Sequence, residues 1–136
     1  MKTTKTKLIL PEIAERIRKT QFPEVDLIVG IASGGTVPAS LVAFHLDKPL
    51  EVVSINYRDE DNNPRYEAPQ LLTRVNEPIT GKRILLVDDV SVSGKTLETA
   101  KDLFDGCEVT TFVLKGQADI SVFPEVSSCV DWPWKK

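Results

Sequence analysis

The chain has 136 residues, 41% of them hydrophobic, which is enough for one domain with a single sizeable core. The net charge is −3 and the lysines and arginines are scattered, so the sequence lacks the basic stripe that nucleic-acid binding requires. The first fifteen residues lack the apolar core of a signal peptide, and no apolar run approaches the roughly 18 residues of a membrane span. We therefore expect a single cytoplasmic domain over residues 1–136, with no nucleic-acid or membrane partner.

Short β-branched apolar runs alternate along the chain with segments of helical periodicity. The runs are apolar throughout rather than at every second residue, which is typical of strands in a parallel sheet covered on both faces. The expected elements, in chain order, are a helix at 10–20, a strand at 26–31, a helix at 37–46, strands at 51–57 and 83–87, a helix at 95–104 and a strand at 108–114. This order predicts an α/β fold, a mainly parallel twisted sheet with right-handed crossovers and helices on both faces.

Two stretches lack regular periodicity. Residues 58–78 are polar and contain three prolines, and a loop of this length in a small domain is usually functional or disordered, so we expect a flap there. Its arginines, Arg58, Arg65 and Arg74, either meet an anionic ligand on closure or are simply solvated. The tail that follows residue 114 is expected to be irregular.

Two informative loops fall at the carboxyl ends of strands, where ligands bind in sheets of this kind. The first is 32–35, Ala-Ser-Gly-Gly, and the second is 88–96. In the second loop Ser91, Ser93 and Thr96 supply hydroxyls, and the loop leads into a helix whose N-terminal N–H groups favour an anion. This pattern predicts a phosphate site. The alternatives are an ordinary serine or threonine N-cap and, for the glycines, an ordinary strand-to-helix turn.

The triplet Gly94-Lys95-Thr96 invites comparison with a second kind of phosphate site, the P-loop. That pattern requires another glycine five residues before Gly94. The residue there is Asp89, whose carboxylate would compete with a phosphate for the backbone N–H groups. The sequence therefore disfavours a nucleoside triphosphatase.

Asp88 and Asp89 follow the apolar run 83–87 directly. Two neighbouring acids at a strand end can accept hydrogen bonds from a pair of vicinal hydroxyls, or lie in the outer shell of a Mg²⁺ ion attached to a sugar phosphate. The alternative is the solvated start of a loop. Because a phosphate-compatible loop follows at once, we favour a role in binding a sugar phosphate.

Three segments resemble motifs of one known family. Residues 87–97, VDDVSVSGKTL, resemble the motif with which type I phosphoribosyltransferases bind PRPP (5-phosphoribosyl 1-diphosphate), and residues 30–38, GIASGGTVP, resemble their pyrophosphate loop. Residues 57–59, YRD, resemble the start of their flexible flap. The chain is most similar to the 6-oxopurine branch, in particular bacterial xanthine and guanine phosphoribosyltransferases, since 112–115, FVLK, and 132–134, WPW, also have counterparts there.

The resemblance implies the type I phosphoribosyltransferase fold and a Mg²⁺-dependent enzyme. This enzyme would transfer the phosphoribosyl group of PRPP to a nitrogenous base, purine-like, in purine salvage, and would work as a homo-oligomer. Asp88 and Asp89 would be the catalytic acids, which accept the ribose hydroxyls and touch a metal only through water. The remaining residues that the resemblance implies are Ser91, Val92, Ser93, Gly94, Lys95 and Thr96 for the 5-phosphate, Ser33, Gly34 and Gly35 for the pyrophosphate, and Lys115 and Trp132 for the base. Lys115 as a solvent-facing side chain and Trp132 as an anchor for the tail are the alternatives.

Three positions depart from the family's pattern. Val92 stands where 6-oxopurine enzymes place an aspartate near the purine N7, and valine cannot take a proton. Ser33 stands where the pyrophosphate loop commonly has arginine or lysine, and Cys129 where a base-stacking tryptophan is expected, although Trp132 could supply that ring. These departures leave a second function open, a catalytically inactive module that binds PRPP or a nucleotide and regulates.

Overall fold

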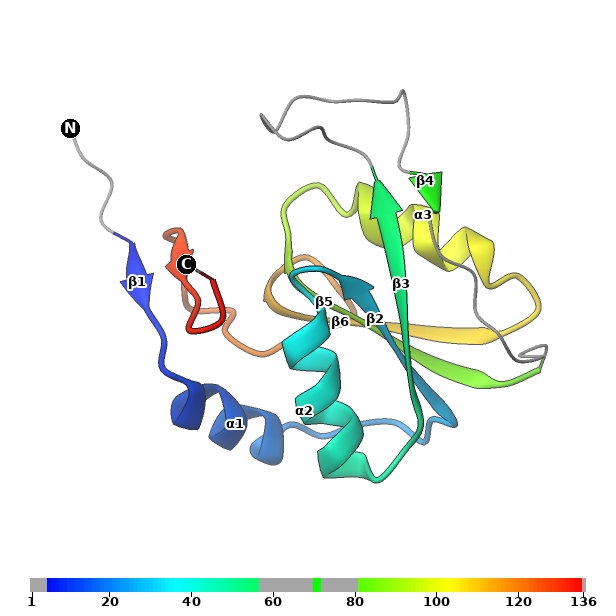
Figure 1. Ribbon diagram of the computed structural model, residues 1–136, viewed down its shortest axis with the longest axis horizontal. Coiled ribbons are helices and arrows are strands. Elements are labelled where there is room, and N and C mark those ends of the chain that lie inside the picture. The colour runs from blue at the N-terminus through cyan, green and yellow to red at the C-terminus, as the bar shows by residue number, and fades with distance from the viewer. Residues whose placement is uncertain (1–4, 57–69, 72–80, 136) are drawn as a thin grey trace.

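The computed structural model describes residues 5–56, 70–71 and 81–135. Within them the chain forms a six-stranded sheet of order β4-β3-β2-β5-β6-β7 and a separate pair, β1 with β8 (Figure 1). The helices are α1 (Leu10–Lys19), α2 (Thr36–Leu46) and α3 (Lys95–Leu103), and the strands are β1 (Thr6–Lys7), β2 (Leu27–Ala32), β3 (Leu50–Asn56), β4 (Gln70–Leu71), β5 (Arg83–Ser91), β6 (Glu108–Gly116), β7 (Ile120–Ser121) and β8 (Val130–Asp131).

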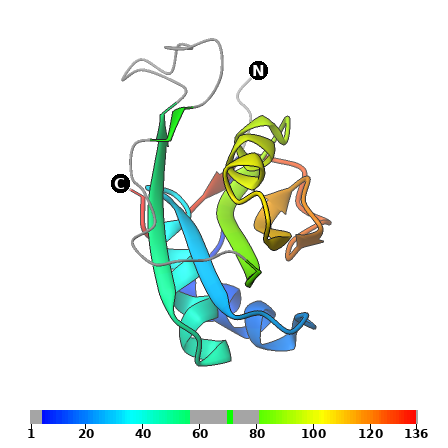
Figure 2. The ribbon, with the colours of Figure 1, turned by 90° about the vertical axis from the view of Figure 1, so that its right-hand side faces the viewer.

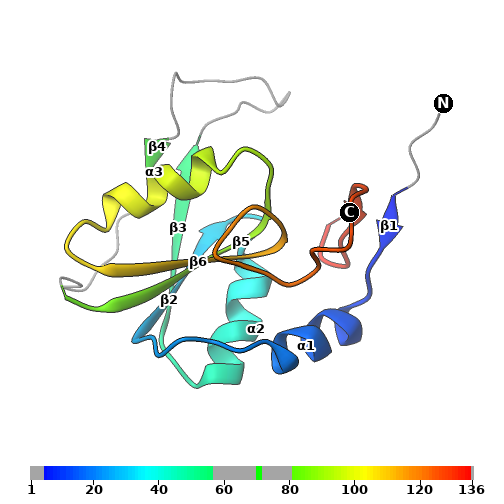
Figure 3. The same cartoon turned by 180° about the vertical axis from the view of Figure 1, so that it is seen from behind.

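The large sheet is mainly parallel and is covered on both faces. All its neighbouring pairs are parallel except β3 with β4. Successive residues of β2 point to opposite faces, so Ile28 packs in one core cluster with Ile13 of α1 and Val42 of α2, while Val29 packs in the other with Leu97 of α3. Seen edge-on and from behind, α3 lies across the sheet from α1 and α2 (Figures 2 and 3). The predicted fold class is confirmed.

β5 extends further than its apolar run predicts. The strand was expected to end at residue 87, but pairing with β6 continues from Asp88 opposite Val113 to Val90 opposite Lys115 and Ser91 opposite Gly116. Aspartate is depleted in strands, so its presence signals an early end, yet the ladder with a long neighbouring strand outweighs that preference. The two acids therefore lie within the end of β5, and the loop before α3 is shorter than expected.

The tail is less irregular than expected. β7 adds to the edge of the large sheet, parallel to β6, and β8 pairs in parallel with β1. Pairings of two residues are too short to leave a periodic pattern in the sequence. Of the expected flap at 58–78, only β4 belongs to the described residues, and the three arginines and the YRD segment at 57–59 lie outside them.

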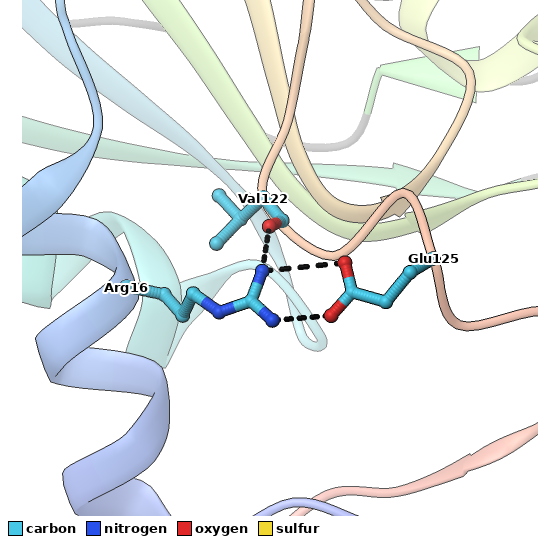
Figure 4. Close-up of polar contacts among 3 residues, drawn as sticks. All are labelled: Arg16, Val122 and Glu125. Carbon is cyan, nitrogen blue, oxygen red and sulfur yellow. Dashed lines mark hydrogen bonds and ion pairs between the residues drawn. The ribbon is translucent and has the colours of Figure 1, made fainter.

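The side chain of Arg16, in helix α1, contacts the segment that follows β7 (Figure 4). Its Nη1 donates to the Val122 carbonyl at 2.9 Å and to Glu125 Oε1 at 3.3 Å, and its Nη2 pairs with Glu125 Oε2. The guanidinium carbon also lies 4.5 Å from the centre of the Phe123 ring. Because β1, which precedes α1, pairs with β8, the N-terminal segment holds the C-terminal segment at two places.

The helices of the described residues are short. They contain 10, 11 and 9 residues, whereas a helix that crosses a bilayer needs about 20 apolar residues. Within 5–56, 70–71 and 81–135, none has the length and apolar character of a membrane span.

Candidate functional site

A cavity of about 180 Å³ lies where β5 turns into α3. Its wall contains all six residues predicted for a 5-phosphate, Ser91 to Thr96, together with the first acid, Asp88, and two further residues, Val90 and Leu97. The chain enters α3 through Gly94, whose φ of 78° is in the left-handed region that glycine adopts without steric cost. Gly94 itself has no side chain to cap α3, and the Ser93 hydroxyl accepts the N–H of Lys95, the first residue of the helix, at 3.3 Å. The backbone N–H groups of the first helical turn, which have no partner within an α-helix, favour an anion here.

Val92 projects from this loop into solvent. Its side chain is 83% exposed although it is large and apolar, whereas Ser91, the neighbouring residue in the strand end, is buried. An exposed valine contributes little to folding, and its hydrocarbon side chain can neither donate nor accept a proton. The position is therefore open to substitution without harm to the core.

The glycine loop after β2 packs directly on the second acid. A Cβ on Gly34 would lie 2.5 Å from Asp89 Oδ2, and one on Gly35 would lie 2.6 Å from the carbonyl oxygens of Ile31 and Val87. A side chain at Gly35 would collide with backbone and does not fit, whereas a side chain at Gly34 would displace the Asp89 carboxylate. The peptide bond between Ala32 and Ser33 is cis, and Ser33 is exposed. The two predicted loops therefore meet at Asp88 and Asp89.

Each of the two acids has one carboxylate oxygen that accepts a hydrogen bond from the backbone N–H of the next residue. Asp88 Oδ1 accepts the N–H of Asp89 at 2.8 Å, and Asp89 Oδ1 accepts the N–H of Val90 at 2.7 Å. Asp89 is 6% exposed, so it is not the solvated start of a loop. Its Oδ2 is buried and accepts no hydrogen bond within the described residues. The only partner of this atom in the described residues is the Lys135 ammonium, which forms an ion pair with it at 3.2 Å, so a ligand hydroxyl or a hydrated cation could use the atom if the ammonium moved away.

Burial, and after it the negative charge of Asp89, raises the pKa of Asp88 from 3.8 to about 8. The side-chain hydrogen bond with Asp89 also raises the pKa of Asp88, whereas the hydrogen bond from the Asp89 backbone N–H and then the positive charge of Lys135 lower it. The pair therefore favours one shared proton near neutral pH, and a bound cation or hydroxyl donors would release that proton.

We expect this acid pair to make folding pH-dependent. Asp88 has a higher pKa folded than unfolded, so between pH 4 and 8 the folded state binds more protons, and stability falls as pH rises, by at most about 1.4 kcal/mol per pH unit. Urea unfolding at pH 5.5 and 8, in EDTA, should show this loss in the parent and a smaller one in Asp88→Asn. Asp26, whose pKa Arg83 lowers to about 2, titrates below this window. Equal losses in parent and variant would contradict the raised pKa.

The two residues predicted to bind the base, Lys115 and Trp132, differ in burial and surroundings. Lys115 is half-buried at the carboxyl end of β6, directly opposite Val90 in register. Trp132 is 3% exposed, and its ring stacks on that of Trp134 with the centres 5.2 Å apart. Trp132 thus lies beneath Trp134, and Trp134, which was not singled out for the base, is the more accessible ring of the two. Cys129 is exposed.

The site suits Mg²⁺ only as a cation shared with a ligand. No cluster of three or more His, Cys, Asp or Glu side chains that could hold a metal occurs in the part of the chain that the structure describes. Asp88 and Asp89 nevertheless offer carboxylate oxygens, the donors that Mg²⁺ prefers, and Asp89 Oδ2 lacks a hydrogen bond. Mg²⁺ characteristically keeps several waters and uses one or two carboxylates together with substrate phosphates, so this donor set fits it.

Comparison with known proteins identifies the family. Residues 3–123 match the phosphoribosyl transferase domain. The chain belongs to this family. The orotate phosphoribosyltransferase of Saccharolobus solfataricus is 32% identical over 88 residues, 65% of this chain and 40% of that protein. The xanthine-guanine phosphoribosyltransferase of Cereibacter sphaeroides is 33% identical over 116 residues, 79% of this chain and 67% of that protein. A purine phosphoribosyltransferase structure from Pyrococcus horikoshii has a TM-score of 0.72 at 26% identity, covering 97% of this chain and 95% of that one.

The phosphoribosyltransferase relatives do not agree on a base. Their names include orotate, xanthine-guanine and purine enzymes, and proteins named transcriptional regulator GfcR and bifunctional protein PyrR also match. The type I fold and the family are thus confirmed, whereas the expected place in the 6-oxopurine branch is not singled out. The chain spans 40% of the length of the orotate relative.

Proposed function

We propose that this protein transfers the phosphoribosyl group of PRPP to a nitrogenous base, purine-like, and releases pyrophosphate. The observation that carries the proposal is the meeting of two loops at one acid pair. Asp88 lines the cavity formed by Ser91 to Thr96, and Asp89 contacts Gly34 of the other loop. A ligand with a phosphate at one end, a diol in the middle and a second anionic group would contact the cavity, the acid pair and the glycine loop in turn.

In this arrangement the cavity before α3 takes the 5-phosphate. Its backbone N–H groups and the hydroxyls of Ser93 and Thr96 are donors, and the positive end of the helix dipole adds attraction. The acid pair accepts the ribose hydroxyls, and the loop of Ser33, Gly34 and Gly35 lets backbone approach the diphosphate. Fixing both ends of PRPP holds C1 of the ribose in place, so the work of the protein is positioning and electrostatic stabilisation.

The reaction breaks the bond between C1 and the diphosphate oxygen and forms a bond from C1 to a nitrogen of the base. The bonding electrons leave with pyrophosphate, and the base gives up an N–H proton. Val92 cannot accept this proton, so on this site the proton leaves to water or to the departing pyrophosphate. Mg²⁺, which the family typically requires, supplies charge neutralisation to the pyrophosphate when bound. Lys115 would donate a hydrogen bond to an exocyclic oxygen of the base.

Pyrophosphate release tests this function. We expect the purified protein with Mg²⁺ and PRPP to release pyrophosphate in the presence of at least one base from a panel of adenine, guanine, hypoxanthine, xanthine, uracil and orotate. Chromatography should show the matching nucleoside monophosphate in equal amount. Release without any nucleotide would indicate hydrolysis of PRPP, and tight PRPP binding without release under any condition would contradict transfer.

The second candidate is a regulatory module that binds PRPP or a nucleotide without turnover. Val92 and exposed Ser33, which supply neither a proton acceptor nor a cation, favour it. The same measurements separate the two functions, because a regulator binds with no nucleotide formed.

A further inference from the structure

The C-terminal segment brings a cation to the acid pair. After β8 the rings of Trp132 and Trp134 stack on each other, and the N–H of Lys135 donates to the Trp132 carbonyl at 3.2 Å, which forms a turn. The Lys135 ammonium then lies 3.2 Å from Asp89 Oδ2. A residue far from the motif in sequence thus reaches the centre of the candidate site.

The contact between Lys135 and Asp89 is an ion pair and not an aligned hydrogen bond. Asp89 Oδ2 has no hydrogen-bond partner by geometry, although Lys135 Nζ is 3.2 Å away. The two facts agree because Coulomb attraction depends on distance and only weakly on direction. The Lys135 side chain is 55% exposed and that of Asp89 is 9% exposed, so the ammonium can leave the acid by rotating without disturbing the core.

The carboxylate oxygen that pairs with this ammonium lies against the glycine loop. This oxygen, Asp89 Oδ2, is also the atom that a Cβ on Gly34 would approach to 2.5 Å. The loop residues Ala32 to Thr36 carry no cationic side chain. A strongly negative group held on this loop therefore needs positive charge from another element, and Lys135 already pairs with the acid on which the loop packs.

We propose that Lys135 is a further ligand-binding residue of this site, whose ammonium moves from Asp89 to the diphosphate of PRPP when a ribose hydroxyl replaces it on Asp89. This inference rests on the proposed function. The hydroxyl, a neutral donor, attracts Asp89 less than the ammonium does, and new charge-assisted hydrogen bonds to phosphate oxygens offset that loss. The ammonium has three donors and can contact two phosphate oxygens at once. The tail would thus act on the diphosphate end of the ligand and not on the 5-phosphate end.

Calorimetry with separate parts of the ligand tests this exchange. We expect Lys135→Met, which keeps the length and removes the charge, to weaken binding of Mg²⁺-pyrophosphate and Mg²⁺-PRPP by about tenfold or more. Ribose 5-phosphate, which has the hydroxyls but no diphosphate, should bind as tightly as to the parent or more tightly. Lys135→Arg should retain most of the pyrophosphate affinity. Lys48→Met, which removes an exposed lysine just before β3 at the other end of the sheet, is the matched control and should leave all affinities unchanged.

Two results would overturn the inference. The first is an unchanged pyrophosphate affinity in Lys135→Met, and if ribose 5-phosphate then binds more tightly, Lys135 is only a competitor of the ligand. The second is equal weakening for all ligands together with a lower melting temperature, which would make Lys135 a structural anchor of the tail. A different result would refute the proposed function instead. If the parent binds pyrophosphate and Lys135→Met weakens that binding, but the parent does not bind PRPP, the contact between Lys135 and pyrophosphate stands and the proposed function does not.

Discussion

Asp88→Asn together with Asp89→Asn should abolish the binding of Mg²⁺-PRPP while leaving the fold intact. Hydrogen bonds to a charged acceptor are worth about 1.5–3 kcal/mol each, so losing two weakens binding by roughly 10²–10⁴-fold. Each asparagine retains the oxygen that accepts the neighbouring backbone N–H, at 2.8 Å for Asp88 and 2.7 Å for Asp89. Calorimetric titration with Mg²⁺-PRPP measures the loss.

The stability of the same variant is what separates a ligand site from a structural one. Burial and the charge of Asp89 raise the pKa of Asp88 to about 8, so ionising both acids opposes folding at pH 8. We therefore expect the double variant to unfold at the same urea concentration as the parent at that pH or at a higher one. Asp102→Asn with Asp105→Asn, two exposed acids at the far end of α3, makes the same change in net charge and should leave ligand binding unaffected. Parent-like PRPP affinity in the first variant would show that these acids do not bind the ligand.

The sequence predicted those parts of the site whose residues are neighbours in the chain. A strand, a short loop and a helix in succession place residues 91–96 around one cavity by local geometry alone, and the motif could be recognised in one segment. The meeting of Gly34 with Asp89 followed from a general rule, that the carboxyl ends of parallel strands lie at one edge of a sheet. The end of β5 was predicted too early because its pairing partner is a distant strand.

The tail could not be predicted because nothing local determines it. β1 and β8 are two residues each, and the Arg16 contacts to Val122 and Glu125 join segments from opposite parts of the chain. Lys135 belongs to no recognisable motif. It reaches the candidate site only because these contacts fix the position of the C-terminal segment. The WPW sequence at 132–134 suggested a base platform, yet which ring is covered follows from packing, with Trp132 buried beneath Trp134.

Val92→Asp should raise transfer to an oxopurine. The position lines the cavity beside the acid pair and projects into solvent, 83% exposed, so a carboxylate there is hydrated and the fold tolerates it. If the base site is purine-like, the new carboxylate can take the N–H proton that valine cannot. General bases typically contribute about 10²–10⁴-fold. Initial rates with guanine, hypoxanthine and xanthine at saturating Mg²⁺-PRPP should increase by at least the lower end of this range.

Val92→Asn is the matched control for this substitution, because asparagine has the shape and polarity of aspartate but accepts no proton at neutral pH. We expect Val92→Asn to stay at the rate of the parent, and the rate of Val92→Asp to rise with pH as the new carboxylate ionises. A rise in both variants would assign the effect to polarity and not to proton transfer. Vigorous oxopurine transfer by the parent, unchanged in Val92→Asp, would mean that the proton already leaves by another route and that valine at this position costs the reaction nothing. Impaired transfer in Val92→Asp alone would point to a base that needs no proton acceptor there, since the carboxylate must lose its water beside the incoming ring.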